Sequence, residues 1–172
     1  MSFSTPCYAG IFEISGGGSY THSTYDTEDS FNWRRTWGLQ VAYHFTERSG
    51  IELGFEDVYD VTNIQGFESV TTHDQIYSID WIQGFTDRNS AIQPYVKAGA
   101  GQLNRTASGN FLGGISPPTE VDSVTVILGV GLRLFITKGF AIKGEALSYL
   151  ADGNINTWQD NISVNAGISF FF

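Results

Sequence analysis

Long stretches in which apolar and polar residues alternate are the feature that most constrains the fold of this chain. From Ile162 to the terminal Phe172, every even position is apolar, and almost every odd position is small or polar. The odd positions between Phe31 and Phe45 likewise collect Trp, Leu, Val, Tyr and Phe. A tilted strand of about 9–11 residues crosses a bilayer, with lipid-facing and interior positions in alternation. Both segments are therefore long enough to span a membrane as β-strands.

Composition alone would not reveal a membrane protein, because the mean hydropathy is -0.10 and no run approaches the roughly 20 apolar residues of a membrane helix. A barrel places its apolar residues at every second position, so the period is the informative signal. The formal net charge of -9 argues against a nucleic-acid partner. One cysteine excludes an intramolecular disulfide, and without a linker or repeat we expect a single domain over residues 1–172.

The pattern predicts eight strands, and short and long connections alternate between them. The predicted strands are 9–21, 31–46, 50–59, 75–86, 92–104, 122–136, 139–150 and 161–172. Tight turns are expected at 46–50, 87–90 and 137–139, and longer polar loops at 21–30, 60–74, 105–121 and 151–160. Outer-membrane barrels have short periplasmic turns and longer external loops. We therefore predict an all-β fold, an eight-stranded antiparallel transmembrane β-barrel with both termini in the periplasm.

Charged residues collect on the predicted inward face, at similar heights along the strands. They are Glu13, Glu52, Asp80, Lys97, Arg133, Lys143 and Glu145. An eight-stranded barrel is just wide enough for its side chains to fill. Charges inside it are desolvated, so each needs a partner. The sequence predicts a lumen plugged by ion pairs, and the alternative is a gate in which other pairings open a thin water path for ions.

Two segments resemble known outer-membrane proteins. The terminal Phe172, with Phe170 and the alternating apolar positions before it, resembles the C-terminal assembly signal of bacterial outer-membrane barrels. Residues 94–101, Pro-Tyr-Val-Lys-Ala-Gly-Ala-Gly, resemble a strand of small eight-stranded outer-membrane proteins, the group that contains the OmpA membrane domain. The resemblance implies a monomer in the bacterial outer membrane that contacts membrane lipid, lipopolysaccharide and the barrel-assembly machinery.

Catalysis and metal binding find little support in the sequence. Nucleophilic hydrolysis needs a serine, a histidine base and a carboxylate within reach, and only His22 and His73 have such residues nearby, among them Asp26, Asp74 and Ser78. The acidic segments 26–29 and 56–60 do not match the spacing of an EF-hand. We expect no enzyme activity, no cofactor and no metal.

Aromatic residues cluster at two heights of the predicted strands, as interfacial girdles do. They include Tyr20, Trp33, Trp37, Tyr43, Phe45, Trp81, Phe85 and Phe170. A stacking platform for bases or sugars is the rival interpretation, but the sequence shows no accompanying basic or polar groove.

Two classes of function remain open at this point. The favoured one is a non-enzymatic barrel that serves envelope integrity or surface interaction through its external loops. The alternative is a narrow channel for small or hydrophobic solutes, and a soluble ligand-binding barrel comes third.

Overall fold

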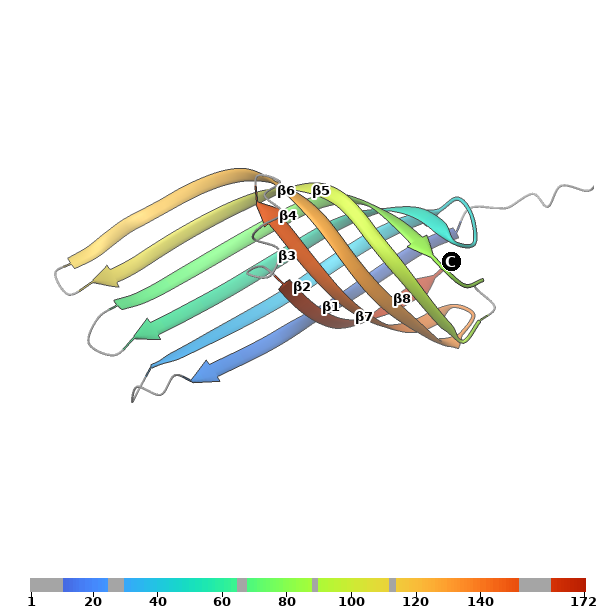
Figure 1. The fold of residues 1–172 in the computed structure, drawn as a ribbon, viewed down its shortest axis with the longest axis horizontal. Coiled ribbons are helices and arrows are strands. Elements are labelled where there is room, and N and C mark those ends of the chain that lie inside the picture. Colours follow the sequence, from blue (N-terminus) through green and yellow to red (C-terminus); the bar gives the residue numbers. More distant parts are fainter. Residues whose placement is uncertain (1–10, 25–29, 65–67, 88–89, 112–113, 152–161) are drawn as a thin grey trace, which may run out of the picture.

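The computed structural model describes residues 11–24, 30–64, 68–87, 90–111, 114–151 and 162–172. Its strands are β1 (Ile11–Thr24), β2 (Phe31–His44), β3 (Ser49–Ile64), β4 (Glu68–Gly84), β5 (Ile92–Phe111), β6 (Gly114–Thr137), β7 (Phe140–Ala151) and β8 (Ile162–Phe171). Each strand pairs antiparallel with the next, and β8 pairs with β1 to close the barrel (Figure 1). The predicted eight-stranded antiparallel barrel is confirmed. Among the described residues, no helix is long and apolar enough to cross a membrane.

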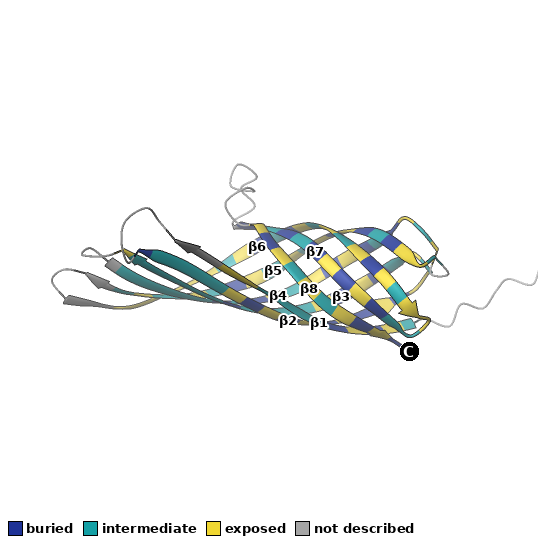
Figure 2. Cartoon of the chain, turned by 90° about the horizontal axis from the view of Figure 1, so that it is seen from below, coloured by how far each residue is buried: buried dark blue, intermediate teal, exposed yellow. Residues whose placement is uncertain are grey.

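Side chains alternate between the interior and the outer wall, as Figure 2 shows by burial. In β2, exposed and buried residues follow one another without a break from Arg35 to His44. Exposed apolar side chains from every strand form a continuous belt, with Ile14, Leu39, Leu53, Ile79, Val96, Leu128, Ile142 and Ile168 as one member from each strand. The inside and outside assignments predicted from the period are confirmed at these positions.

The two ends of the barrel differ. The terminal end carries the C-terminus and the β2–β3, β4–β5 and β6–β7 connections (Figure 1). At the other end, here called the protruding end, β1 to β6 continue past β7 and β8 as a curved sheet. In keeping with this, among the described residues the pairing of β8 with β1 reaches no farther than Gly18 of β1, and that of β7 with β6 no farther than Thr125 of β6.

Two of the predicted loops are wrong. Residues 60–74 continue β3 and β4, which pair as far as Ile64 and Glu68. Residues 105–121 likewise continue β5 and β6, which pair as far as Phe111 and Gly114. These extensions are mostly polar, with scattered apolar residues such as Val61 and Val121, so they lack the apolar alternation that marks the belt. The predicted loop at 21–30 is also wrong at its start, because Thr21 to Thr24 continue β1 and pair with β2. Residues 25–29, residues 152–160 of the loop predicted at 151–160, and Cys7 lie outside the described residues.

Two prolines inside β6 are explained by a β-bulge. The β5–β6 register shifts between Ala107, which pairs with Thr119, and Gly109, which pairs with Ser116. Pro117 and Pro118 fall within this shift. Proline donates no backbone hydrogen bond and is tolerated in sheets at bulges and edges. The bulge therefore lets β6 continue through a sequence that by itself predicts a loop.

Candidate functional site

The seven charged residues predicted to face inward all lie in the interior. Glu13 comes from β1, Glu52 from β3, Asp80 from β4, Lys97 from β5, Arg133 from β6, and Lys143 and Glu145 from β7. Each is buried, and Glu13 and Glu52 have no exposed surface. The two-residue period of the strands points them inward.

Arg133 and Glu13 form an ion pair toward the terminal end. Arg133 donates from Nη2 to Glu13 Oε2 at 2.8 Å and from Nε to Oε1 at 3.3 Å. Its Nη1 donates to Gln93 Oε1 at 3.2 Å, and its guanidinium carbon lies 4.3 Å from the centre of the Tyr95 ring. On the other side, Glu13 Oε2 lies 2.7 Å from His44 Nε2. The guanidinium is therefore satisfied by a carboxylate, an amide and an aromatic face.

Glu52 connects two lysines at the centre of the interior. Lys97 Nζ donates to Glu52 Oε1 at 2.5 Å and lies 3.4 Å from Asp80 Oδ2. Lys143 Nζ lies 3.3 Å from Glu52 Oε2 and 3.1 Å from Glu145 Oε1. Acidic and basic side chains thus alternate across the barrel, as buried charges require.

Several interior partners were not assigned to this site from the sequence. Tyr95 donates to Glu145 Oε1 at 2.7 Å, and Tyr149 donates to the carboxylate of Glu56. Both tyrosines occupy odd positions, in step with Lys97 on β5 and with Lys143 on β7. The alternation could therefore have identified them as interior residues, although not which carboxylates they contact.

An apolar cluster lies beside the charges on the side of the protruding end, and the sequence analysis missed it. It consists of Ile76, Leu103, Ile127, Leu147 and Tyr149. Farther toward the protruding end, Arg105 donates to both carboxylate oxygens of Asp74 at 2.8 and 2.7 Å. These hydrogen bonds raise the pKa of the Arg105 guanidinium, which lies beyond the apolar belt.

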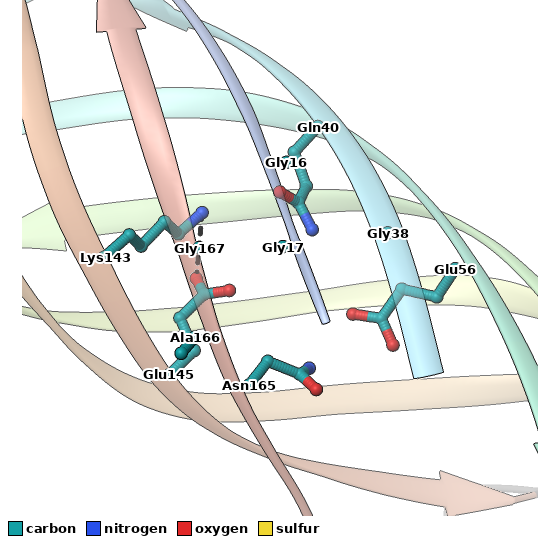
Figure 3. Close-up of a pocket in the computed structure, with 10 residues that line it drawn as sticks. All are labelled: Gly16, Gly17, Gly38, Gln40, Glu56, Lys143, Glu145, Asn165, Ala166 and Gly167. Carbon is teal, nitrogen blue, oxygen red and sulfur yellow. Dashed lines mark ion pairs between the residues drawn. The ribbon is translucent and has the colours of Figure 1, made fainter. Parts of the chain in front are cut away.

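The space left between the interior side chains is very small. One cavity of about 10 Å³ lies among Gln40, Glu56, Lys143 and Glu145, which point toward it in Figure 3. A second of about 10 Å³ is lined by Gln40, Glu56, Asp80 and Lys97, among others. A cavity of this volume holds about one water molecule.

The candidate catalytic groups do not come together on β4. His73 faces the outer wall, with Nε2 2.7 Å from Asp57 Oδ2. Ser78 faces the interior, where its hydroxyl donates to Asp80 at 2.7 Å, and Asp74 is engaged by Arg105. The side chain of His22 and all of Asp26 lie outside the described residues. Within the described part of the chain, no group of three or more His, Cys, Asp or Glu residues could hold a metal ion.

The two terminal aromatic positions lie at the junction where the barrel closes. Phe170 packs on Phe140 with ring centres 5.2 Å apart. Phe172 exchanges backbone hydrogen bonds with Phe12, at 2.9 and 3.3 Å, and its side chain is exposed. The last residue of the chain therefore extends the pairing of β8 with β1.

Comparison with known families agrees with this barrel and its apolar belt. A family model described as outer membrane protein beta-barrel domain matches residues 1–170. The chain belongs to this family. It is therefore related to bacterial outer-membrane proteins, and its structural neighbours are small barrels of the same kind. No curated protein sequence matches it.

Three solved structures illustrate the similarity of this outer-membrane barrel to known folds. The N-terminal barrel domain of Pseudomonas aeruginosa OprF aligns with a TM-score of 0.61 and 18% identity, covering 95% of this chain and 97% of that chain. The attachment invasion locus protein Ail of Yersinia pestis aligns with a TM-score of 0.60 and 15% identity, covering 96% of this chain and 100% of that chain. A major outer membrane protein of Thermus thermophilus aligns with a TM-score of 0.64 and 10% identity, covering 96% of this chain and 100% of that chain. At these identities the similarity shows the fold alone.

Proposed function

We propose that this protein is a non-enzymatic outer-membrane barrel whose ion-paired interior acts as a plug. It serves envelope integrity, or surface interaction through its protruding end. The observation that carries the proposal is the interior itself, where Glu52 binds both Lys97 and Lys143 and the two cavities among the charged side chains measure about 10 Å³ each. A hydrated ion needs more room than one water molecule occupies.

We further propose that the protruding end faces the outside of the cell, with the termini in the periplasm. The extended strands at this end are mostly polar, which suits an aqueous environment, whereas the turns at the terminal end are short. Outer-membrane barrels place their longer connections outside. In this orientation Phe170 and Phe172 are the signal for the barrel-assembly machinery, and the barrel acts as a monomer surrounded by lipid and lipopolysaccharide. Ail, an attachment protein by its name, is a precedent for surface interaction by this fold.

Conductance across a planar bilayer tests the plug. We expect no steady conductance from the unmodified protein, and small openings from Arg133→Ala, which removes the partner of Glu13. Arg105→Ala is the matched control, because Arg105 is partly exposed at the rim and should leave conductance unchanged. Large, steady conductance of the unmodified protein would refute the plug and favour a narrow channel for small or hydrophobic solutes.

A further inference from the structure

The outer wall changes from apolar to polar toward the protruding end. Leu39, Phe55 and Tyr77 are cross-strand partners on β2, β3 and β4 and belong to the belt. One row closer to the protruding end, the outward-facing partners are Trp37, Asp57, Gln75, Asn104 and Asp122. A charged side chain is costly in the hydrocarbon and tolerated near its boundary. On β2 and β3, the step from Leu39 and Phe55 to Trp37 and Asp57 therefore marks the level at which lipid headgroups meet the barrel.

Arg35 lies just beyond this boundary, on the outer wall, and is surrounded by aromatic residues. Its cross-strand partners are Tyr20 on β1 and Tyr59 on β3. Its neighbours on the same face of β2 are Trp33 and Trp37. The Arg35 side chain is exposed, and within the part of the chain that the structure describes it forms no ion pair or hydrogen bond.

The groups around Arg35 are held in place by one another. Tyr20 stacks on Trp33 with ring centres 6.4 Å apart, and Trp33 contacts Tyr59 at 5.4 Å. Asp57, the nearby carboxylate, accepts a hydrogen bond from Trp37 Nε1 at 3.1 Å, and its other oxygen lies 2.7 Å from His73 Nε2. Both oxygens of Asp57 are thus engaged, which leaves Arg35 available for an anion from outside the protein.

We propose that Arg35 and the four aromatic residues around it, Tyr20, Trp33, Trp37 and Tyr59, bind the phosphorylated sugar headgroup of an outer-leaflet glycolipid. A guanidinium matches a phosphate through two parallel hydrogen bonds. Aromatic residues flank Arg35 on both neighbouring strands, and an aromatic ring can pack on the C–H face of a pyranose, which a glycerophospholipid headgroup lacks. The sequence showed no basic or polar groove beside these aromatic residues, whereas in the folded barrel Arg35, Asp57 and His73 lie next to them.

The height of the site and the charge of the chain favour a membrane-bound ligand. The net charge of -9 repels free polyanions from solution. A glycolipid instead arrives at the level of Arg35, because its acyl chains lie along the belt below. The assignment to the outer leaflet rests on the orientation proposed above, whereas the binding chemistry does not.

Binding of purified lipid A to the folded protein in detergent tests the site, followed through the change in tryptophan fluorescence with Trp81 and Trp158 replaced by Phe, so that Trp33 and Trp37 report. The ligands are lipid A with its phosphates, dephosphorylated lipid A, and phosphatidylglycerol. We expect the phosphorylated form to bind tightest, and Arg35→Gln to weaken it about tenfold, since charge-assisted hydrogen bonds to a phosphate are lost. Binding of the dephosphorylated form should not change in this variant.

Arg48→Gln is the matched control, because Arg48 is also an exposed arginine but lies at the terminal end. It should bind lipid A like the parent, and far-UV circular dichroism should show all variants folded. Equal binding of both lipid A forms by the parent, no change in Arg35→Gln, an equal loss in Arg48→Gln, or tightest binding of phosphatidylglycerol would each overturn the proposal. Since the assay needs neither a closed interior nor a defined orientation, its failure is distinct from failure of the proposed function.

Discussion

Arg133 is the interior residue with the most varied set of partners. Besides Glu13 and Gln93, its guanidinium contacts the ring of Tyr95 and lies 5.9 Å from the centre of the Phe171 ring. Only 1% of its surface is exposed. Removing one member of a buried pair leaves its partner charged and desolvated, which costs more than the net contribution of the intact pair.

Arg133→Ala should therefore reduce the free energy of unfolding in lipid by about 3–5 kcal/mol. The rim variant Arg105→Ala should lose no more than about 1 kcal/mol, because Arg105 is 44% exposed and water replaces its contacts. Denaturant unfolding in phospholipid bilayers measures both. If Arg133→Ala were as stable as its parent, Arg133 would not be holding a buried network.

Residue by residue, the sequence predicted which charges point inward but not which of them meet. The inward direction follows from the two-residue period, which is local. The contact of Lys143 with Glu52 joins β7 to β3 across the interior, and it depends on strand tilt and stagger, which belong to the closed barrel. Arg35 was overlooked because its significance comes from Tyr20 and Tyr59 on neighbouring strands.

The junction of β1 and β8 depends on two glycines that face each other across the strands. Gly17 of β1 and Gly167 of β8 are direct cross-strand partners. A Cβ on Gly17 would lie 2.6 Å from the carbonyl oxygen of Ala166 and 2.8 Å from the Cα of Gly167. Backbone atoms cannot move aside as the end of a long side chain can. The close approach of the two strands therefore requires glycine here.

Gly17→Ala should destabilise the barrel by about 1–3 kcal/mol, the usual cost of forcing an extra carbon into a packed site. Gly16→Ala is its neighbouring control, since the nearest atom to a Cβ there lies at 3.6 Å, an ordinary contact. Unfolding curves in the same lipid compare the two directly. Equal losses in both variants would mean that the junction is not limited by this contact.

At the level of elements, the sequence predicted the number of strands and which residues of each strand face inward, but not where the strands end. Inside the belt, lipid on one face and packed interior on the other enforce alternation, and the period reveals every strand. Beyond the belt, β3 to β6 are mostly polar without regular alternation, so residues 60–74 have the composition of a loop although Asp60 pairs with Thr72. Strand pairing there depends on hydrogen bonds to the neighbouring strand, because no contrast between lipid on one face and packed interior on the other enforces an alternation.

The whole molecule is asymmetric along its axis. Short turns and the C-terminus lie at one end, and the curved sheet of β1 to β6 rises from the other (Figure 1). The glycolipid site at Arg35 and a surface role for the protruding end both require this end to lie outside the cell. Orientation is thus the property of the whole barrel that links these proposals.

Single cysteines at the two ends report the orientation in cells. Thr119→Cys places a thiol on the exposed part of β6, and Arg48→Cys places one in the β2–β3 turn, with Cys7 replaced by Ser in both. A maleimide carried on a polyethylene glycol too large to cross the outer membrane should label Thr119→Cys on intact cells, because long connections lie outside. Arg48→Cys should be labelled only after the outer membrane is disrupted, which also shows that its thiol is reactive. Labelling of Arg48→Cys on intact cells, with Thr119→Cys protected, would mean that the barrel has the opposite orientation and that the Arg35 site lies at the inner leaflet.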